Sequence, residues 1–312
     1  MIGKFFIVKS LFLLIAFSFI ILGCNTDDPN KNPDDQNNNE DSTKQIVAPA
    51  IIGFVPFEIA ESSGIAMTTS TKIWSHNDSG GKNELYSFDF KGNIVRTITI
   101  SNATNIDWED LTVDNKKRIY IGDFGNNNNI RKDLVIYRMP DPESFSANSV
   151  EAETLHFSFE DQTSFPPDAS QKNFDVEAMV WKNDSLFMFT KDRSTPITGY
   201  TKLYKIAATP GTQIARLAGK YYLGNTTTSA RVTSADIDPE SGDIALLTQD
   251  RLVVFRNYSG NNFFSGKTTE YNFAPVPGQV EAVFFAGRKK VYMTEEISSS
   301  NPGNLYEVTL LK

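Results

Sequence analysis

Five segments of the chain share one pattern, and this repetition constrains the fold more than any other feature of the sequence. In each segment a small or acidic residue precedes an apolar stretch, a β-rich run ending in polar residues follows, and an apolar-aromatic strand completes the pattern. The apolar stretches that open the segments lie at residues 61–66, 107–111, 175–179, 232–237 and 279–283. A recurrence of about 50 residues is typical of repeat architectures.

A fourth β-rich run lies between successive segments, at residues 94–100, 154–159, 220–223 and 268–273. The repetitive part of the chain contains no amphipathic helix pattern of useful length. Four strands per repeat at this period are typical of propeller blades, so the sequence predicts an all-β fold, a five-bladed β-propeller. Six blades are the alternative, if the long stretch at 141–172 contains an additional irregular blade.

The last segment ends with its third strand, at residues 305–311, and lacks a fourth. Residues 51–59 precede the first segment and can supply the missing strand. Such a pairing would close the ring and remove an open sheet edge. We therefore expect an N-terminal strand to complete the last blade.

One position in the first strand of each segment is small and polar or acidic throughout. Its five members are Ser63, Glu109, Glu177, Ser234 and Glu281. Because the innermost strand of every blade lines the central channel, these side chains should form a ring around the axis. Carboxylates so close together cannot all stay ionised without compensation.

A hard divalent cation would remove this conflict. Ca²⁺ takes 6–8 oxygen ligands at about 2.3–2.6 Å, which suits three carboxylates, two hydroxyls and water. Zinc fits poorly, because the chain has only two histidines, His76 and His156. The sequence thus predicts an axial Ca²⁺ site. The alternative is a water-filled channel in which the glutamates accept hydrogen bonds from backbone N–H groups.

The order Ser, Glu, Glu, Ser, Glu around a five-bladed body resembles the calcium-activated nucleotidases, also called soluble apyrases. The resemblance implies a central Ca²⁺ held by the five residues of the ring, and nucleotide hydrolysis. Several literal strings instead resemble exported bacterial propeller proteins whose activity is not assigned. These strings are Glu-Ser-Ser-Gly at Glu61, His-Asn-Asp-Ser-Gly at His76, Asp-Trp-Glu-Asp-Leu at Asp107 and Tyr-Ile-Gly-Asp-Phe-Gly at Tyr120.

Charged residues gather where the second strands end, on one face of the predicted propeller. The catalytic candidates among them are Asp78, Asp123, Asp192 and Arg193. In a phosphate-ester or nucleotide hydrolase, a metal would polarise the phosphoryl oxygen, Arg193 would hold its charge and an aspartate would activate water. Ordinary turn chemistry explains the same residues. The sequence has no nucleophile elbow of the Gly-x-Ser-x-Gly type, phosphate-binding loop or dinucleotide fingerprint.

The N-terminus has the parts of a signal peptide: Lys4 and Lys9, an apolar stretch at 11–22, and Gly23. Cys24, the only cysteine, follows at once. The sequence Ile-Leu-Gly-Cys resembles a bacterial lipobox, which implies cleavage before Cys24 and attachment of acyl chains such as palmitate. An ordinary secretory signal or a membrane anchor is the alternative.

Residues after Cys24 are almost entirely polar as far as residue 44, and such a segment cannot bury enough surface to fold. The predicted organisation is therefore a lipoprotein signal peptide at 1–23, a disordered tether at 24–45 and a propeller at 46–312. Such a chain would be lipid-anchored in the bacterial cell envelope, periplasmic or exposed at the surface.

The net charge of −8 and the absence of a basic stripe argue against a nucleic acid as partner. We expect a monomer whose propeller rim binds an unknown ligand or protein. Two function classes remain open, a binding module with an axial Ca²⁺ and a Ca²⁺-dependent hydrolase of apyrase type.

Overall fold

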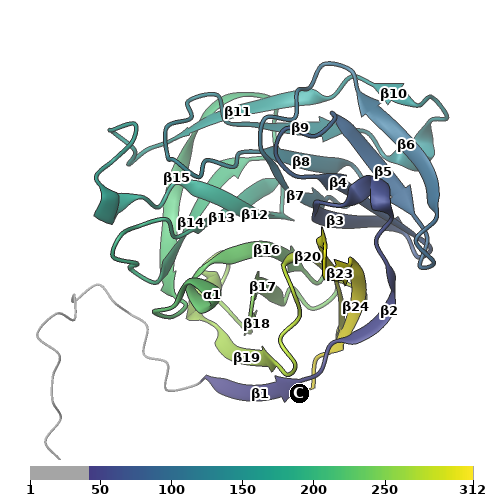
Figure 1. The fold of residues 1–312 in the computed structure, drawn as a ribbon. Coiled ribbons are helices and arrows are strands. Elements are labelled where there is room, and N and C mark those ends of the chain that lie inside the picture. Colours follow the sequence, from purple (N-terminus) through teal and green to yellow (C-terminus); the bar gives the residue numbers. More distant parts are fainter. Residues whose placement is uncertain (1–41, 312) are drawn as a thin grey trace, which may run out of the picture. The chain divides into compact units, whose positions relative to one another are not determined.

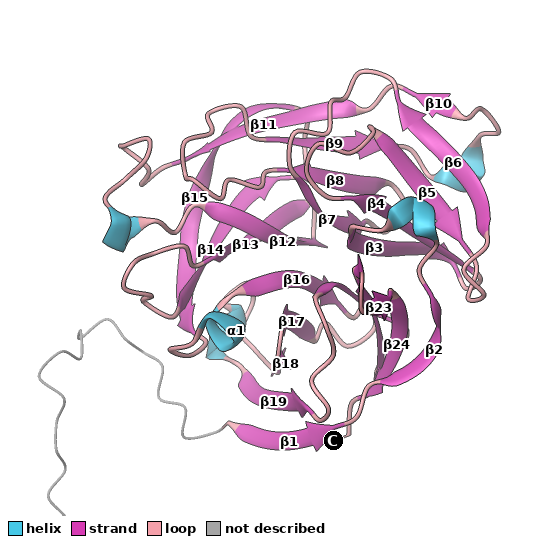
Figure 2. Ribbon diagram, in the orientation of Figure 1, coloured by secondary structure: helices cyan, strands magenta, loops and turns pink. Residues whose placement is uncertain are grey.

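The computed structural model describes residues 42–311 (Figure 1). The predicted signal peptide, Cys24 and residues 24–41 of the predicted tether lie outside the described residues. The described part is almost entirely β-strand, with a few short helical turns (Figure 2). Within it, no helix has the length and apolar character needed to cross a membrane.

The strands form two five-stranded sheets, one eight-stranded sheet, one four-stranded sheet and a two-stranded hairpin. The eight-stranded sheet consists of two antiparallel four-stranded units whose outermost strands pair in parallel, with Leu155 opposite Gly211. Each of the two five-stranded sheets also contains a four-stranded antiparallel unit, and the four-stranded sheet is itself such a unit. The repeating pattern of the sequence therefore corresponds to repeating four-stranded units, as the all-β prediction requires.

From the axis outward, the first unit contains β3 (Ser62–Thr69), β4 (Lys72–Asn77), β5 (Glu84–Phe88) and β6 (Ile94–Ile100). The second contains β7 (Trp108–Val113), β8 (Ile119–Asp123), β9 (Val135–Met139) and β11 (Glu153–Phe159). The third contains β12 (Asp175–Lys182), β13 (Ser185–Lys191), β14 (Tyr200–Ala207) and β15 (Gly211–Tyr222).

The fourth unit contains β16 (Val232–Ile237), β17 (Ile244–Thr248), β18 (Arg251–Arg256) and β19 (Lys267–Phe273). The last contains β20 (Val280–Phe285), β21 (Lys290–Glu295), β24 (Asn304–Thr309) and β2 (Ala50–Phe54). The innermost strands β3, β7, β12, β16 and β20 contact one another in this order, and β20 returns to β3 (Figure 1). The units therefore surround a common axis.

The N-terminal strand closes the last unit as the sequence predicts. β2 pairs antiparallel with β24, with Ile51 opposite Tyr306 and Gly53 opposite Leu305. The strand ends at Phe54, and the end of the predicted segment forms a helical turn at Phe57–Ile59. Closure therefore joins the two ends of the repeat array.

A second N-terminal strand was not expected. β1 (Thr43–Val47) pairs in parallel with the outer edge of β19, so the ordered fold begins before residue 46, within the predicted tether. The stretch at 141–172 contains β10 (Ser149–Val150), which pairs with β6 of the first unit, and β11, the outer strand of the second unit, which pairs with β9 and β15. β22 (Ile297–Ser298) and β23 (Asn301–Pro302) form the hairpin, and α1 is a single turn at Thr227–Ala230.

The hydrophobic core lies between neighbouring units. Between the first and second units, for example, Trp74 packs in the same cluster as Trp108 and Ile121, and all three are fully buried. Complete burial of a large apolar side chain contributes roughly 1.5–3 kcal/mol, so these contacts hold adjacent sheets face to face. Trp74 and Trp108 are therefore core residues whose place in the sequence is explained by packing between the two sheets.

Candidate metal centre

Each inner strand carries a β-bulge near its start, and this bulge decides which side chain is displaced from the regular ladder. In β7 the pairing passes from Trp108 to Asp110, which leaves Glu109 as the extra residue. The same shift leaves Glu177 in β12 and Glu281 in β20. The three glutamates of the predicted ring therefore occupy equivalent positions.

The fourth repeat follows a different frame from the one expected. Its register passes from Val232 to Ser234, so the extra residue is Thr233, and Ser234 corresponds to Ala178 of β12. In the first repeat the bulge falls one residue later, because Ser63 pairs with His76 and the extra residue is Gly64. Ser63 still follows Ser62 as Glu109 follows Trp108, since Ser62 pairs with Asn77 and Trp108 with Asp123 at the same point of the two units. The structural ring is therefore Ser63, Glu109, Glu177, Thr233 and Glu281.

The hydroxyl groups of this ring link inner strands to one another. Ser63 Oγ donates to the backbone oxygen of Glu109 at 2.6 Å, and Thr233 Oγ1 donates to the backbone oxygen of Val280 at 2.9 Å. Ser234, which follows Thr233 in β16, donates from its Oγ to Asp110 Oδ1 at 3.1 Å. The structure thus uses these hydroxyls to join units.

A lysine lies among the three ring glutamates. Lys191 Nζ is 2.9 Å from Glu177 Oε2. Burial opposes the charge of Lys191, but the carboxylates of Glu177, Glu281 and Glu109 outweigh it and raise its pKa. Part of the positive charge that the crowded carboxylates require is therefore supplied by the protein itself.

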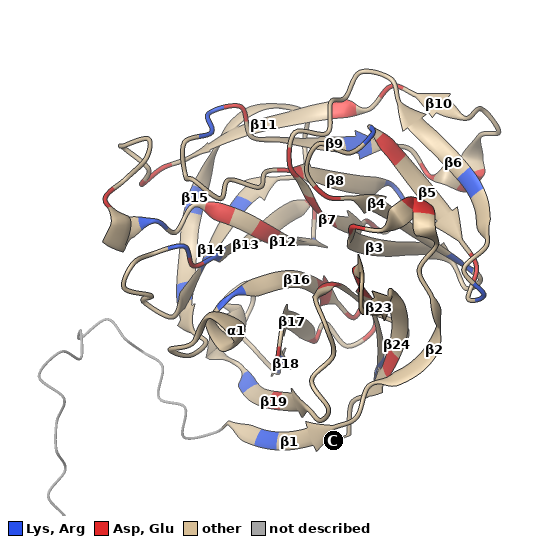
Figure 3. Ribbon diagram, in the orientation of Figure 1, with Lys and Arg blue, Asp and Glu red and all other residues tan. Residues whose placement is uncertain are grey.

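Arg193 holds a second pair of carboxylates. Its Nε lies 2.5 Å from Asp175 Oδ2, and its terminal nitrogen lies 2.9 Å from Glu177 Oε1. Glu177 is thus bound by both Lys191 and Arg193. Burial, and then the charge of Glu177, raise the pKa of Asp175 to about 7. Figure 3 shows acidic positions on β7 and β12, which contribute this cluster.

Three other carboxylates converge without such partners. One oxygen from each of Asp78, Asp107 and Glu109 lies within 4.8 Å of the others. This separation is about twice the Ca²⁺–oxygen distance, so one ion could contact all three. Among the described residues, no donor hydrogen-bonds to the carboxylates of Asp107 and Glu109, and Asp78 accepts only from the N–H of Ser79 at 2.5 Å.

The pKa values of these three carboxyl groups are raised, and burial is the main cause. It raises the pKa of Asp78 to about 6 and that of Asp107 to about 6. It also raises the pKa of Glu109 well above its ordinary value, with further contributions from the charges of Glu177 and Asp78. The charges of Lys191, Arg131 and Arg193 lower these pKa values, but none of these side chains forms an ion pair with the three carboxylates. The carboxylates are therefore only partly compensated by the protein, as in a site that accepts a cation.

Glu109 also belongs to a second close group, with Asp175 and Glu177. The two partners of Glu109 in that group are already held by Lys191 and Arg193. We therefore assign the candidate metal centre to Asp78, Asp107 and Glu109, and use this name for those three residues below.

A glycine creates the space in which two of these carboxylates meet. A Cβ atom on Gly125 would clash with Oε1 of Glu109 and with the carboxylate of Asp107. Gly125 is the last residue of the Tyr-Ile-Gly-Asp-Phe-Gly string and lies two residues after the end of β8. The close approach of backbone to carboxylates requires a residue without a side chain at this point.

Glu281 lies outside the candidate metal centre. Its Oε1 accepts from Gln249 Nε2 at 3.1 Å. Burial raises the pKa of Glu281 to about 7, while the charge of Lys191 opposes this rise. Two of the three glutamates expected as ligands, Glu177 and Glu281, thus have protein partners.

The other catalytic candidates from the sequence support local structure. Asp123 is fully buried, accepts from the backbone N–H of Asp107 at 3.1 Å and pairs with Arg131 at 2.9 Å. Asp192 is fully buried and accepts from Ser194, Thr198 and Gly199. By register, Asn77 of the first unit corresponds to Asp123 of the second, and Asp78 lies one residue beyond that position.

Asp107 and Asp175 were not recognised from the sequence as site residues. A signal for them exists, because the second and third repeats both begin with Asp-x-Glu, at Asp107 and at Asp175. In the structure each Asp lies close to the Glu that follows it, since carboxylate oxygens of Asp107 and Glu109, and those of Asp175 and Glu177, lie within 4.8 Å of each other.

No family model matches the chain, and no curated protein matches it. Among solved structures, a PQQ-bound aldose sugar dehydrogenase from Streptomyces coelicolor is 10% identical, with 84% of this chain and 98% of that chain covered and a TM-score of 0.51. A gluconolactonase from Xanthomonas campestris is 12% identical, with 81% and 73% covered and a TM-score of 0.45. A virginiamycin B lyase from Staphylococcus aureus is 14% identical, with 80% of this chain and 66% of that chain covered and a TM-score of 0.38.

These similarities concern the fold alone. The match to the dehydrogenase spans nearly the whole of that protein at low identity. Together with the ring of antiparallel units, it shows that the chain is a β-propeller. The chemistry of the site must be argued from its own residues.

Proposed function

We propose that this chain is an exported β-propeller that binds one Ca²⁺ ion at the candidate metal centre and acts as a ligand- or partner-binding module of the cell envelope. The observation that carries the proposal is the convergence of Asp78, Asp107 and Glu109 within 4.8 Å without a protein cation paired to them. Hard oxygen ligands with no nearby thiol suit Ca²⁺ best.

Pairing of the basic residues favours binding over hydrolysis. In the described part of the chain, Lys191, Arg193 and Arg131 at this end all form ion pairs with carboxylates. A phosphate would have to displace these partners before a guanidinium could hold it. A Ca²⁺-dependent hydrolase of apyrase type is the second candidate, since Asp78, the least buried member of the candidate metal centre, could also contact water.

Calorimetric titration tests the proposed cation site. Ca²⁺ added to chelator-treated protein should bind with a stoichiometry of one, and Glu109→Gln should weaken the affinity at least about tenfold, because charge count tunes Ca²⁺ affinity. Glu151→Gln, which alters an exposed glutamate, is the matched control. No binding to the wild type, or equal binding to Glu109→Gln, would refute the proposal.

The same preparation distinguishes the second candidate. Release of phosphate from a nucleoside diphosphate that requires Ca²⁺, and that Asp78→Asn abolishes, would establish the hydrolase. Binding of Ca²⁺ without turnover of nucleotides or simple phosphate esters would leave the ion as a structural or ligand-positioning element.

Attachment to the membrane through Cys24 is part of the proposal. It rests on the single cysteine placed directly after a signal-like stretch. Cys24→Ser should move the protein from the membrane fraction to the soluble fraction without changing its melting temperature, and mass spectrometry of the wild type should find acyl chains on Cys24. A Cys24→Ser protein that stays in the membrane fraction would favour a retained anchor helix.

A further inference from the structure

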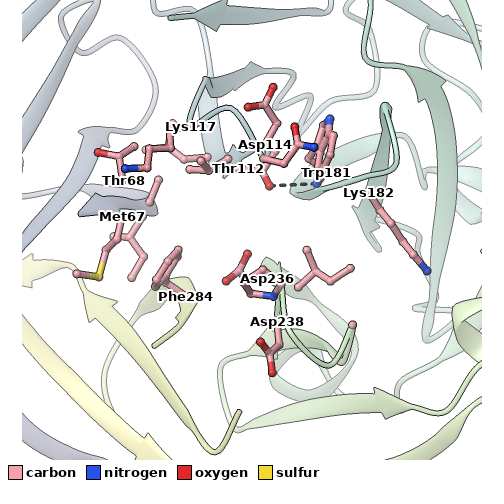
Figure 4. Close-up of a pocket in the computed structure, with 18 of the residues that line it drawn as sticks. Met67, Thr68, Thr112, Asp114, Lys117, Trp181, Lys182, Asp236, Asp238 and Phe284 are labelled. Atoms are coloured by element: carbon pink, nitrogen blue, oxygen red, sulfur yellow. Dashed lines mark hydrogen bonds between the residues drawn. The ribbon is translucent and has the colours of Figure 1, made fainter. Parts of the chain in front are cut away.

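A cavity lies where the inner strands end, at the end of the propeller axis opposite to the candidate metal centre; Figure 4 shows the residues that line it. Its volume is about 560 Å³, within the range of about 300–1,000 Å³ typical of small-molecule sites. The last residues of the inner strands line it, and its apolar surface includes Ile65, Met67, Leu111, Trp181, Ile237 and Phe284.

A hydrogen-bonded layer separates this cavity from the candidate metal centre. Asp110, on β7, accepts from the backbone N–H of Met179 at 2.7 Å and from Ser234 Oγ at 3.1 Å. Ser234 Oγ accepts in turn from the backbone N–H of Val283 at 3.1 Å. These bonds join β7 to β12, β16 and β20 across the axis, so the two ends can be occupied independently.

One acidic side chain points into the apolar cavity. Figure 4 shows the carboxylate of Asp236 between Phe284 and Trp181. One of its oxygens accepts from the backbone N–H of Phe285 at 2.7 Å. Burial raises the pKa of Asp236 to about 7, although the N–H groups of Phe285 and Ile237 lower it.

The other charged residues around the cavity do not neutralise Asp236. Lys182 Nζ points away and donates to the backbone oxygen of Gly260 at 2.8 Å (Figure 4), and Lys117 is exposed. Asp114 pairs with Arg118 at 2.6 Å, and Asp238 accepts from Ser241 Oγ at 2.7 Å. A buried carboxylate among apolar walls is costly unless a cation accompanies it.

Two residues of the lining also have a buried polar atom without a hydrogen-bond partner. Thr68 Oγ1 and Trp181 Nε1 are buried and make no hydrogen bond with the described residues. The backbone N–H of Trp181 is bonded to Thr112 Oγ1 at 3.1 Å, which fixes the strand but leaves the indole N–H unpaired (Figure 4). Because neither atom is exposed, a ligand in the cavity would not contact them directly.

We propose that this cavity binds a small amine with an apolar, aromatic-sized body. The ammonium group would pair with Asp236, and the body would lie against Trp181, Ile237 and Phe284. Trp181 could add a cation–π contribution. The inference does not depend on Ca²⁺ binding at the other end.

Tryptamine and its neutral counterpart tryptophol, which has a hydroxyl in place of the amine, test the proposal by calorimetric titration. We expect tryptamine to bind at least about tenfold more tightly than tryptophol. Asp236→Asn, which keeps an oxygen acceptor for the N–H of Phe285, should remove this preference. Equal binding of the two compounds, or no binding of tryptamine, would overturn the proposal, as would an unchanged preference in Asp236→Asn.

A second variant tests the cavity independently, in case Asp236→Asn does not fold. Val113→Phe enlarges a half-buried lining residue without changing any charge and should abolish tryptamine binding. Asp168→Asn, at an exposed aspartate whose side chain makes no capping hydrogen bond, is the control for general electrostatics and should bind tryptamine as the wild type does. Tryptamine binding that survives Val113→Phe would place the amine elsewhere and refute the proposal.

Discussion

The acidic residues at one end of the axis differ in what holds them. Glu177 and Asp175 are bound by Arg193, whereas Glu109 and Asp107 have no bonded partner among the described residues. A buried carboxylate without a donor is destabilised in its charged form, so an added cation gains most where partners are missing. The candidate metal centre is therefore distinguished from the other axial carboxylates by its lack of hydrogen-bonding and ion-pair partners, and not by its distance from the axis.

Gly125 offers a test that changes no charge. Gly125→Ala places a methyl group against the carboxylates of Glu109 and Asp107, so it should weaken Ca²⁺ binding about tenfold or more. Calorimetric titration measures the effect. Gly219→Ala is the control, since its nearest neighbour is a side-chain atom at 3.3 Å. Unchanged affinity in Gly125→Ala would argue that the ion binds elsewhere.

Asp192 is expected to matter for stability and not for binding. Its carboxylate accepts from the backbone and hydroxyl groups of Ser194 and Thr198 and from the N–H of Gly199. Asp192→Ala leaves these donors without their acceptor and should lower the free energy of unfolding by about 3 kcal/mol. Urea denaturation measures this loss. A cost below about 1 kcal/mol would mean that water replaces the carboxylate.

At the scale of elements, the closing strand β2 approaches its neighbours tightly. A Cβ atom on Gly53 would clash with the backbone oxygen of Phe90. Gly53→Ala should therefore lower the free energy of unfolding by about 1–3 kcal/mol, measured by urea denaturation. Gly219→Ala, within the long strand β15, should cost less. Equal costs in the two variants would show that β2 is not tightly held.

The sequence predicts the units and the closing strand well, because both follow from local pattern. Strand alternation recurs at a fixed period, and the last repeat visibly lacks an outer strand. β1 could not be found this way. Its first residues, Thr43–Gln45, continue a polar stretch, and only two apolar residues follow them in the strand, so no strand pattern is visible; β1 pairs along the open edge of β19.

The candidate site is predicted less completely, for a physical reason. A bulge adds one residue to a strand, and a one-residue slip turns every later side chain to the other face. The sequence does not show whether Thr233 or Ser234 is the extra residue of the fourth repeat. The alignment of the repeats places Ser234 there, whereas the structure has Thr233. The partners of Glu177 come from β13 and the loop after it, which no spacing rule connects to β12.

For the whole molecule, the crowded acidic end should govern the pH dependence of stability. Burial raises the pKa to about 6 for Asp78 and Asp107, and to about 7 for Asp175, Glu281 and Glu296. Between about pH 4 and 7 the folded protein keeps protons that the unfolded chain releases, so the free energy of unfolding falls as the pH rises.

Ca²⁺ should oppose this trend, because it binds the ionised carboxylates. Thermal melting in chelator is expected to give a lower melting temperature at pH 8 than at pH 5.5, and added Ca²⁺ should stabilise the protein more at pH 8. A melting temperature in chelator that rises from pH 5.5 to pH 8 would contradict the assigned shifts.

The most direct test of the candidate metal centre is a crystal structure of the propeller with bound Ca²⁺, or with Mn²⁺ located by its anomalous scattering. We expect one axial ion in contact with carboxylate oxygens of Asp78, Asp107 and Glu109, at about 2.3–2.6 Å for Ca²⁺. An ion held instead by Glu177 and Glu281, with Lys191 displaced, would contradict the assignment. So would a map at saturating metal with no ion at this end of the axis.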